Sequence, residues 1–469
     1  MRTKKQLIID NFKSFKDCDK FYNFLPCKTL KNSVGVVEAT FPTSSTNLKE
    51  ASLNLADAGI TEVGGLSYFK QYFPDENLSI HRLVVYSADK KVYINQMFDE
   101  DFDLYWLYEM QFDSAPISLA FKQNDSDSII LAGSDKMMVW KTDFSPYIIE
   151  NAPIITSMCV NDNALFCTIK EPAFKIWYNT ALNAEKVGSE DSKSGYISLV
   201  DELGYARKVI AFDENVYAFR DYGISKISIN KSEISVNQVY QFNTKIYANT
   251  ISACGNKIIF MTKEGMYSFN GVKVMKLDID FSSYKFENYE SAVASSLSDK
   301  YYLALRLNFN DNSKIECESG NFINNAMIIV NILDNSFEIV RGVDIKSFLP
   351  LKTELVEKML VTFNSVYKDK IGQIEDSSKC FNNNLTKSYQ TKSIVQSETN
   401  KLFTKLIVKS QINVVIKLKY DNNEINLTTY KTGINEFNFK ICCKDIKFEI
   451  ISELNHVEIE KMLLEYYEY

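Results

Sequence analysis

The sequence has little glycine, proline or histidine. Its 469 residues include 16 Gly, 8 Pro and 2 His. Turns usually recruit glycine and proline, so we expect Asn, Asp and Lys to serve as turn residues instead. The histidines, His81 and His456, are far apart in the sequence. They disfavour a Ser-His-Asp or Cys-His site and are too few for a zinc centre. We expect both to be surface or capped residues and not catalytic bases.

The sequence also lacks the short motifs that mark common catalytic sites. It contains no P-loop, no dinucleotide-binding G-x-G-x-x-G, no H-E-x-x-H and no G-x-S-x-G. Its nine cysteines form no C-x-x-C, and the only adjacent pair is Cys442-Cys443. Scattered cysteines of this kind are typical of reduced core residues in a cytosolic protein. We therefore predict a protein that is not an enzyme and that holds no metal or cofactor.

Targeting and spanning segments are missing as well. The basic start, Met1 to Lys5, is followed by only three apolar residues, so it is no signal peptide. No apolar run approaches the roughly 20 residues that span a bilayer. The 53 basic and 60 acidic residues give a net charge of −7, which argues against broad binding to nucleic acid or anionic membranes.

What the sequence does have is aromatic and β-branched residues in a repeating pattern. Tyr and Phe number 27 and 31, and such rings suit the pleated surface of a sheet. From about residue 80, an apolar strand repeatedly runs through a short polar turn into a second apolar strand. Residues 81–86 do so into 91–94, and residues 208–212 into 216–219. Successive turns lie at the spacing of propeller blades, roughly 40 residues.

This pattern predicts an all-β fold, a β-propeller of about six to seven blades over residues 79–375. An irregular two-sheet sandwich is the alternative, because sandwiches also have short, regularly spaced strands. The register places six apolar residues on buried central strands: Val84, Ile130, Phe166, Tyr217, Ile259 and Leu303. Charged substitutions at any of them would be strongly destabilising.

The flanking segments differ in pattern from the propeller. Residues 376–400 are polar and predict a linker, and the alternation over 401–469 predicts a small C-terminal β-sandwich. Residues 1–78 predict an N-terminal arm with short extended segments. The arm concentrates five rings that would need a partner surface: Phe12, Phe15, Phe21, Tyr22 and Phe24. We expect them to form a subunit interface, or else to cover the chain's own propeller.

Two further features could bind small ligands. The acidic run Asp99–Asp103 carries oxygen ligands for a cation such as Ca²⁺ but lacks EF-hand spacing, so we interpret it as a solvated loop. Trp106, Trp140 and Trp177 could stack on sugars, although propeller blades often bury such residues in the core.

Three segments resemble propeller proteins of tailed-bacteriophage virions. Residues 264–271 resemble the glycine-aromatic turn of those propellers, and residues 82–93 resemble their first blade. Residues 444–452, followed by 457–460, resemble the strands of their terminal sandwich, with Asp445 where that family often has glycine. The likeness is to podovirus tail-nozzle or tail-stabilisation proteins and to phage neck or tail-tip propellers, and it covers residues 80–469.

The resemblance implies a structural protein of a phage or prophage virion, made in the host cytoplasm and assembled into the particle. Such proteins form rings in the tail or neck, here a hexamer or dodecamer, that extend the DNA exit channel or dock tail appendages. The implied partners are other copies of the chain, other tail or neck proteins and DNA in transit, with no membrane and no catalytic residues carried over. The alternatives are a carbohydrate- or receptor-binding propeller and a glycoside hydrolase using paired carboxylates.

Overall fold

The computed structural model describes residues 3–12, 18–42, 50–53, 55–95, 104–123, 126–142, 145–230, 233–279, 284–309, 322–354, 356–394, 399–411, 413–454 and 456–468. This part of the chain is nearly all strand. Its helical segments are 3-10 turns of three residues: η2 (Pro74–Glu76), η3 (Ala184–Lys186), η4 (Ala248–Thr250) and η5 (Tyr289–Ser291). No helix within the described residues is long or apolar enough to cross a membrane.

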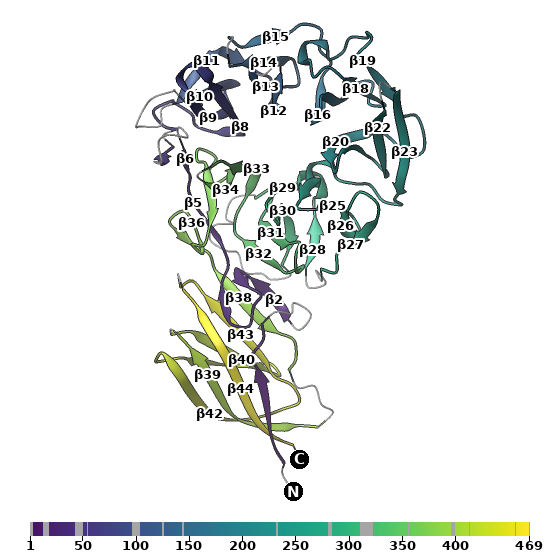
Figure 1. Ribbon diagram of the computed structural model, residues 1–469. Helices are drawn as coiled ribbons and strands as arrows, with labels where there is room; N and C mark the ends of the chain where they lie inside the picture. The colour runs from purple at the N-terminus through teal and green to yellow at the C-terminus, as the bar shows by residue number, and fades with distance from the viewer. Residues whose placement is uncertain are drawn as a thin grey trace.

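Seven sheets of the described chain stand around a common centre as propeller blades (Figure 1). Blade 1 contains β8 (Val63–Phe73), β9 (Leu78–Ser87), β10 (Lys91–Asn95) and β11 (Leu104–Gln111). Blade 2 contains β12 (Ile117–Gln123), β13 (Ser126–Ala132), β14 (Met137–Lys141) and β15 (Tyr147–Ile149). Blade 3 contains β16 (Ile155–Asn161), β17 (Ala164–Ile169), β18 (Lys175–Asn179) and β19 (Ser194–Ser198). Blade 4 contains β20 (Ala206–Phe212), β21 (Asn215–Arg220), β22 (Gly223–Asn230) and β23 (Glu233–Gln241).

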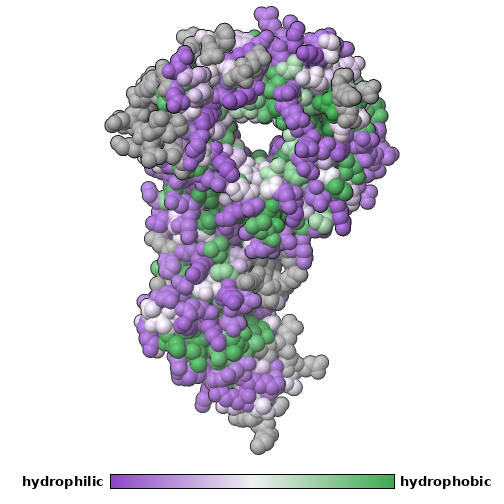
Figure 2. Space-filling view, viewed as in Figure 1, coloured by the Kyte–Doolittle hydropathy of each residue, from purple (hydrophilic) through white to green (hydrophobic). Residues whose placement is uncertain are grey.

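The remaining blades complete the ring. Blade 5 contains β24 (Ser252–Cys254), β25 (Lys257–Thr262), β26 (Gly265–Phe269) and β27 (Val274–Lys276). Blade 6 contains β28 (Lys285–Glu287) and β29 (Val293–Leu297), which both pair with β30 (Lys300–Asn308), then β31 (Ala326–Asn331) and β32 (Phe337–Arg341). Blade 7 contains β33 (Ile345–Lys352), β34 (Glu357–Phe363) and β35 (Gly372–Glu375). The space-filling view shows an opening through the centre of the ring (Figure 2).

Tight turns between strands use the residues expected from the shortage of glycine. Lys90, Asp162 and Asp213 adopt positive φ angles of 72°, 49° and 48°, and Asp tolerates this left-handed region better than most residues. The expected strand register is also confirmed. All six predicted core residues are buried, and they lie on β9, β13, β17, β21, β25 and β30. The predicted all-β propeller of six to seven blades is therefore correct, with seven blades.

Blade 7 is completed by the N-terminal part of the chain. Strand β5 (Gly35–Glu38) pairs antiparallel with β35, and β36 (Lys379–Cys380) and β37 (Asn383–Asn384) extend the same sheet. A separate hairpin joins β6 (Thr40–Pro42) to β7 (Glu50–Ser52). The predicted boundaries at 78 and 376 are therefore wrong. The propeller takes its first inner strand from residue 63 and a closing strand from residues 35–38.

The C-terminal β-sandwich is likewise built from both ends of the chain (Figure 1). One sheet contains β1 (Thr3–Ile9), β3 (Phe24–Leu25), β4 (Leu30–Asn32), β44 (Glu458–Glu468), β39 (Lys401–Ser410) and β42 (Gly433–Cys443). The other has the order β2 (Cys18–Tyr22), β38 (Lys387–Thr391), β43 (Lys447–Ser452), β40 (Val415–Tyr420) and β41 (Asn423–Thr428). The predicted linker 376–400 is thus incorrect, since it contains three strands that belong to sheets.

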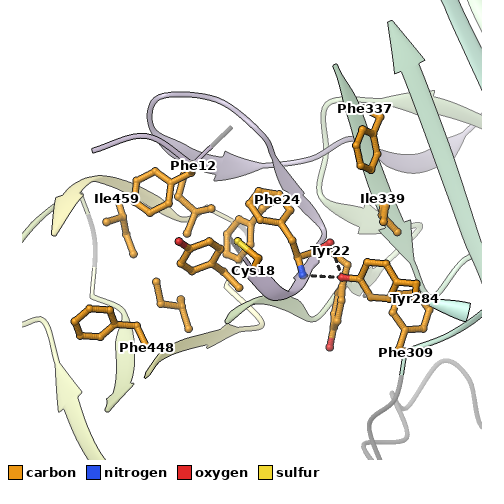
Figure 3. Close-up of a cluster of buried hydrophobic side chains, with 14 of the residues drawn as sticks. Phe12, Cys18, Tyr22, Phe24, Tyr284, Phe309, Phe337, Ile339, Phe448 and Ile459 are labelled. Carbon is orange, nitrogen blue, oxygen red and sulfur yellow. Dashed lines mark hydrogen bonds between the residues drawn. The ribbon is translucent and has the colours of Figure 1, made fainter. Parts of the chain in front are cut away.

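The aromatic residues of the N-terminal arm lie inside the chain's own core. Phe12, Phe21, Tyr22 and Phe24 are all buried, and Phe15 lies outside the described residues. They pack between the sandwich residues Phe448 and Ile459 and the blade 6 residues Phe309, Phe337 and Ile339 (Figure 3). The prediction of an exposed subunit interface is therefore wrong for these four residues. Their partner surface is the junction between propeller and sandwich.

A backbone contact fixes the same junction. The Tyr284 hydroxyl accepts a hydrogen bond from the Phe21 backbone N–H at 2.7 Å and lies 3.0 Å from the Phe21 carbonyl oxygen, to which it donates (Figure 3). Burial raises the pKa of Tyr284, so the phenol keeps the proton that it donates. The arm, blade 6 and the sandwich therefore share one continuous apolar core.

Candidate functional site

The first strand of several blades carries a β-bulge near its start, at the face where loops enter from the preceding blade. The register shifts between Val63 and Gly65, between Ile155 and Ser157, between Ala206 and Lys208, and between Ile345 and Ser347. A bulge leaves one residue out of the ladder and redirects its side chain, which is why bulges are common beside functional sites. In blade 4 the extra residue is Arg207, and its side chain is 42% exposed.

Arg207 is held in one orientation. Its Nε and Nη2 atoms donate to the two carboxylate oxygens of Asp221 at 2.8 and 3.2 Å, a fork-like geometry that is stronger than a single contact. The guanidinium carbon lies 5.3 Å from the ring centre of Tyr205, within cation–π range. Asp221 also accepts a hydrogen bond from the backbone N–H of Tyr205 at 3.0 Å. Arg207 is therefore preorganised before any partner arrives.

The loop before β20, residues 199–205, is held by the buried Arg220. This arginine is 1% exposed and donates to Asp201 Oδ2 at 2.6 Å, and to the carbonyl oxygens of Gly204 and Leu199. Hydrogen bonding from Arg220 lowers the pKa of Asp201. Gly204 has a φ of +78°, and a Cβ atom there would lie 2.8 Å from Asp221. The loop is thus specified by a buried cation and by a position that only glycine fits.

This rigid loop displays large side chains to solvent. Val200 is 77% exposed, and Tyr205 and Tyr222 are also exposed. The Tyr222 backbone N–H donates to the Leu203 carbonyl at 2.9 Å, so its turn is tied to the same loop. We call Val200, Tyr205, Arg207 and Tyr222 the blade-4 face. Tyrosine and arginine are the residue types that dominate the energetics of protein interfaces.

A pocket of ≈ 270 Å³ adjoins the blade-4 face. Arg207 forms one wall, and the loops that lead into blades 5 and 6 form the others, through Lys245, Tyr247, Tyr289 and Glu290. Tyr247 and Tyr289 stack with ring centres 5.1 Å apart and an angle of 11° between their planes. Lys245 Nζ and Glu290 Oε1 pair at 2.9 Å. Burial raises the pKa of both tyrosines, so their hydroxyls are protonated and can donate hydrogen bonds.

Lys208 follows the bulge and is more deeply placed than Arg207. Its Nζ donates to the Ile251 carbonyl oxygen at 2.5 Å. Burial lowers the pKa of Lys208 to about 8. This hydrogen bond links blade 4 to the segment that leads into blade 5.

The sequence-predicted candidates lie elsewhere. His81 is buried, with its Nδ1 2.8 Å from the Tyr68 hydroxyl and its Nε2 3.7 Å from Glu354 Oε2; burial lowers its pKa. His456 is exposed, with Nε2 3.6 Å from Glu458. His81 thus fills the seam between blades 7 and 1 and is not the surface residue that the sequence suggested.

The other predicted ligand sites receive little support. Trp140 and Trp177 are buried, as expected for core residues, whereas Trp106 is exposed with Lys91 Nζ 4.9 Å from its ring centre. The acidic run 99–103 lies outside the described residues. Within the described ranges, no three His, Cys, Asp or Glu side chains are grouped so that they could hold a metal ion.

The sequence patterns missed the blade-4 face, although one signal was present. Only six of the 53 basic residues are arginine, and Arg207 and Arg220 fall within one short segment. Arginine is the cation of choice for bidentate pairing with carboxylates, so its rare occurrences in a lysine-rich chain indicate specific positions.

The fold defines the chain as a seven-bladed β-propeller joined to a β-sandwich. Neither a protein-family model nor a curated protein matches the sequence. Among solved structures, the chain is similar to BBS1N in complex with ARL6DN, at 11% identity and a TM-score of 0.41 over 67% of this chain and 92% of that chain. It is also similar to Hsv2 of Kluyveromyces lactis, at 9% identity and a TM-score of 0.36 over 72% of this chain and 98% of that chain.

A third similar structure is the nidogen/laminin complex, at 10% identity and a TM-score of 0.32 over 54% of this chain and 90% of that chain. Similarities this low say nothing about partners or ligands.

Proposed function

We propose that this chain is a non-enzymatic structural protein that docks another protein on its blade-4 face. The observation that carries the proposal is Arg207, fixed by Asp221 and Tyr205 beside an exposed valine and tyrosines. Rigid aromatic and arginine side chains lose little conformational entropy on binding, so they give affinity efficiently. The cations Arg207 and Lys245 favour an acidic segment on the partner.

We further propose that the chain is part of the tail or neck of a tailed-phage or prophage particle. In this proposal it is made in the host cytoplasm and then assembled into the particle. The support is the sequence resemblance and the combination of a propeller with a β-sandwich. In this proposal copies of the chain form a ring. The four buried aromatic residues of the arm already fill the chain's own core, so ring contacts use other surfaces, such as the exposed outer strands of the blades.

Two exposed valines allow a matched test of the docking face. Val200 lies in the loop between β19 and β20, whereas Val272, 85% exposed, lies in the turn between β26 and β27. Successive antiparallel strands place these two connections at opposite ends of the blades. Particles would be assembled with Val200→Glu or Val272→Glu protein, and incorporation measured by mass spectrometry.

We expect Val200→Glu to abolish incorporation and Val272→Glu to leave it unchanged. Equal incorporation of both variants would refute the proposal that the blade-4 face is the docking surface. The ring is tested separately by light scattering of the purified chain. A strict monomer at high concentration that never co-purifies with particles would refute the virion proposal as a whole.

A further inference from the structure

The pocket beside Arg207 offers hydrogen-bond donors that have no acceptor within the ranges that the structure describes, whereas the carboxylates near it are already paired. Arg207 donates hydrogen bonds from Nε and Nη2 to Asp221, and no residue in the described part of the chain accepts a hydrogen bond from its Nη1. Tyr247 and Tyr289 line the same pocket, and no hydrogen-bond partner of their hydroxyls lies among the described residues. The two nearby carboxylates are engaged, Asp221 by Arg207 and Glu290 by Lys245.

We propose that this pocket binds a carboxylate group, supplied by an aspartate or glutamate side chain of the docked protein. This inference rests on the proposed function and names the chemistry that the blade-4 face recognises. The carboxylate accepts from Arg207 Nη1 and from the tyrosine hydroxyls. Charge-assisted hydrogen bonds from a preoriented arginine to a planar carboxylate are among the stronger polar contacts in proteins.

The charges around the pocket favour a monoanion over a phosphate group. Arg207 and Lys245 supply two positive charges, and Asp221 and Glu290 supply two negative charges. Because this set is neutral overall, each further negative charge on a ligand adds repulsion from Asp221 and Glu290, and a dianion would meet twice as much of it as a monoanion. A carboxylate brings one charge, which Arg207 Nη1 can satisfy directly.

The mouth of the pocket can adjust to an incoming group. The Lys245–Glu290 pair is an exposed one, with side chains 41% and 71% exposed, and such pairs hold their geometry weakly. An incoming carboxylate can therefore replace Glu290 on Lys245 while Glu290 moves into solvent. The walls stay fixed, because Arg207 and the stacked tyrosines are held by other contacts.

The test uses small probes that need no knowledge of the partner. Fluorine NMR would measure binding of 4-fluorophenylacetate to the full-length chain, with 4-fluorophenylacetamide as the neutral probe and 4-fluorophenyl phosphate as the dianionic probe. The protein variants are Arg207→Gln, Tyr289→Phe and the control Arg306→Gln. Arg306 is matched to Arg207, since its side chain is also 42% exposed and lies 3.4 Å from a carboxylate oxygen, that of Glu287.

We expect the acetate probe to bind at least about tenfold more tightly than the amide. Arg207→Gln removes this preference, Tyr289→Phe reduces it, and Arg306→Gln leaves it unchanged. Tyr289→Phe keeps the ring in place, so it tests the site even if Arg207→Gln disturbs the fold. Equal binding of acetate and amide, no binding of the acetate, or stronger binding of the phosphate would each overturn the inference.

The outcome also separates this inference from the docking proposal. If Val200→Glu and Val272→Glu are incorporated equally but the acetate probe binds as expected, the pocket is correct and the docking surface is wrong. If docking fails only for Val200→Glu and the acetate does not bind, the face docks a partner without a carboxylate in this pocket.

Discussion

Glu338 is the buried acidic group whose removal should change the pH dependence of stability most clearly. It lies on β32 with 6% of its surface exposed, beside Val34, which is in the short segment between β4 and β5. The Val34 backbone N–H donates to its carboxylate, whereas Oε2 has no hydrogen-bond partner among the described residues. Burial raises the pKa of Glu338 from 4.5 to about 7, with Lys300 opposing and Asp376 adding to the effect.

The magnitude follows from the difference between folded and unfolded chains. A difference of about 2.5 pKa units corresponds to about 3 kcal/mol. The unfolded chain releases this proton above about pH 4.5, while the folded chain keeps it until about pH 7. Glu338 therefore costs no stability at low pH, and its cost grows as pH rises through this window and is complete above it.

The perturbation is Glu338→Gln, which keeps an acceptor for the Val34 N–H and removes the ionisable group. We expect the free energy of unfolding to increase by about 3 kcal/mol at pH 8 and by less than about 1 kcal/mol at pH 5. Urea unfolding at both pH values measures the change. The control is Glu375→Gln, an exposed glutamate in blade 7, which should change stability little at either pH. A gain of the same size at pH 5 and pH 8 would show that ionisation of Glu338 is not the cause.

Three further predictions concern other buried groups. Arg220→Ala removes the charged partner of Asp201 and the donor to two carbonyl oxygens, those of Gly204 and Leu199. An unsatisfied buried acceptor costs about 1–3 kcal/mol, so thermal unfolding should show a loss of at least about 2 kcal/mol. No loss would mean that the loop is not held by Arg220. Phe24→Ala removes a ring from the junction core and should cost about 3–5 kcal/mol in the isolated chain, whereas an interface residue would leave the unfolding of the isolated chain unchanged. Maleimide should label the exposed Cys442 in the native protein and should label Cys159 only after unfolding. Burial raises the pKa of Cys159 to about 12, and only the thiolate reacts. Mass spectrometry of the labelled peptides measures the modification of each cysteine, and labelling of Cys159 in the native protein would contradict its burial.

The propeller could be predicted because most of its strands pair with strands that are close in the sequence. Blades 1 to 6 each consist of strands that neighbour one another in sequence, so alternation and turn residues such as Lys90 and Asp213 mark them directly. The six core positions followed from the same alternation. Pairing between distant segments leaves no such mark, and this is why β5 was not assigned to blade 7.

The candidate site could not be predicted for a related reason. Arg207 forms part of the candidate site because a bulge in β20 leaves it out of the ladder and because Asp221 and Tyr205 hold its guanidinium group. The pocket beside it takes its lining from the loops that enter three successive blades. None of these contacts forms a motif of fixed spacing, so sequence reasoning could find the scarcity of arginine but not the site.

The same long-range pairing decides how the chain can be divided. Residues 35–38 close blade 7 against 372–375, and β1 pairs with Met462–Glu468 at the end of the chain. The propeller therefore cannot complete blade 7 until residues 372–384 have been synthesised, and the sandwich cannot complete its sheets until residues 458–468 have been synthesised. Such non-local contacts slow folding. A fragment of residues 401–469 would also lack β1 to β4 and β38, which supply strands to both sheets of the sandwich. The N-terminal arm, which the sequence predicted to be a separate segment, thus joins the propeller and the sandwich into one folding unit.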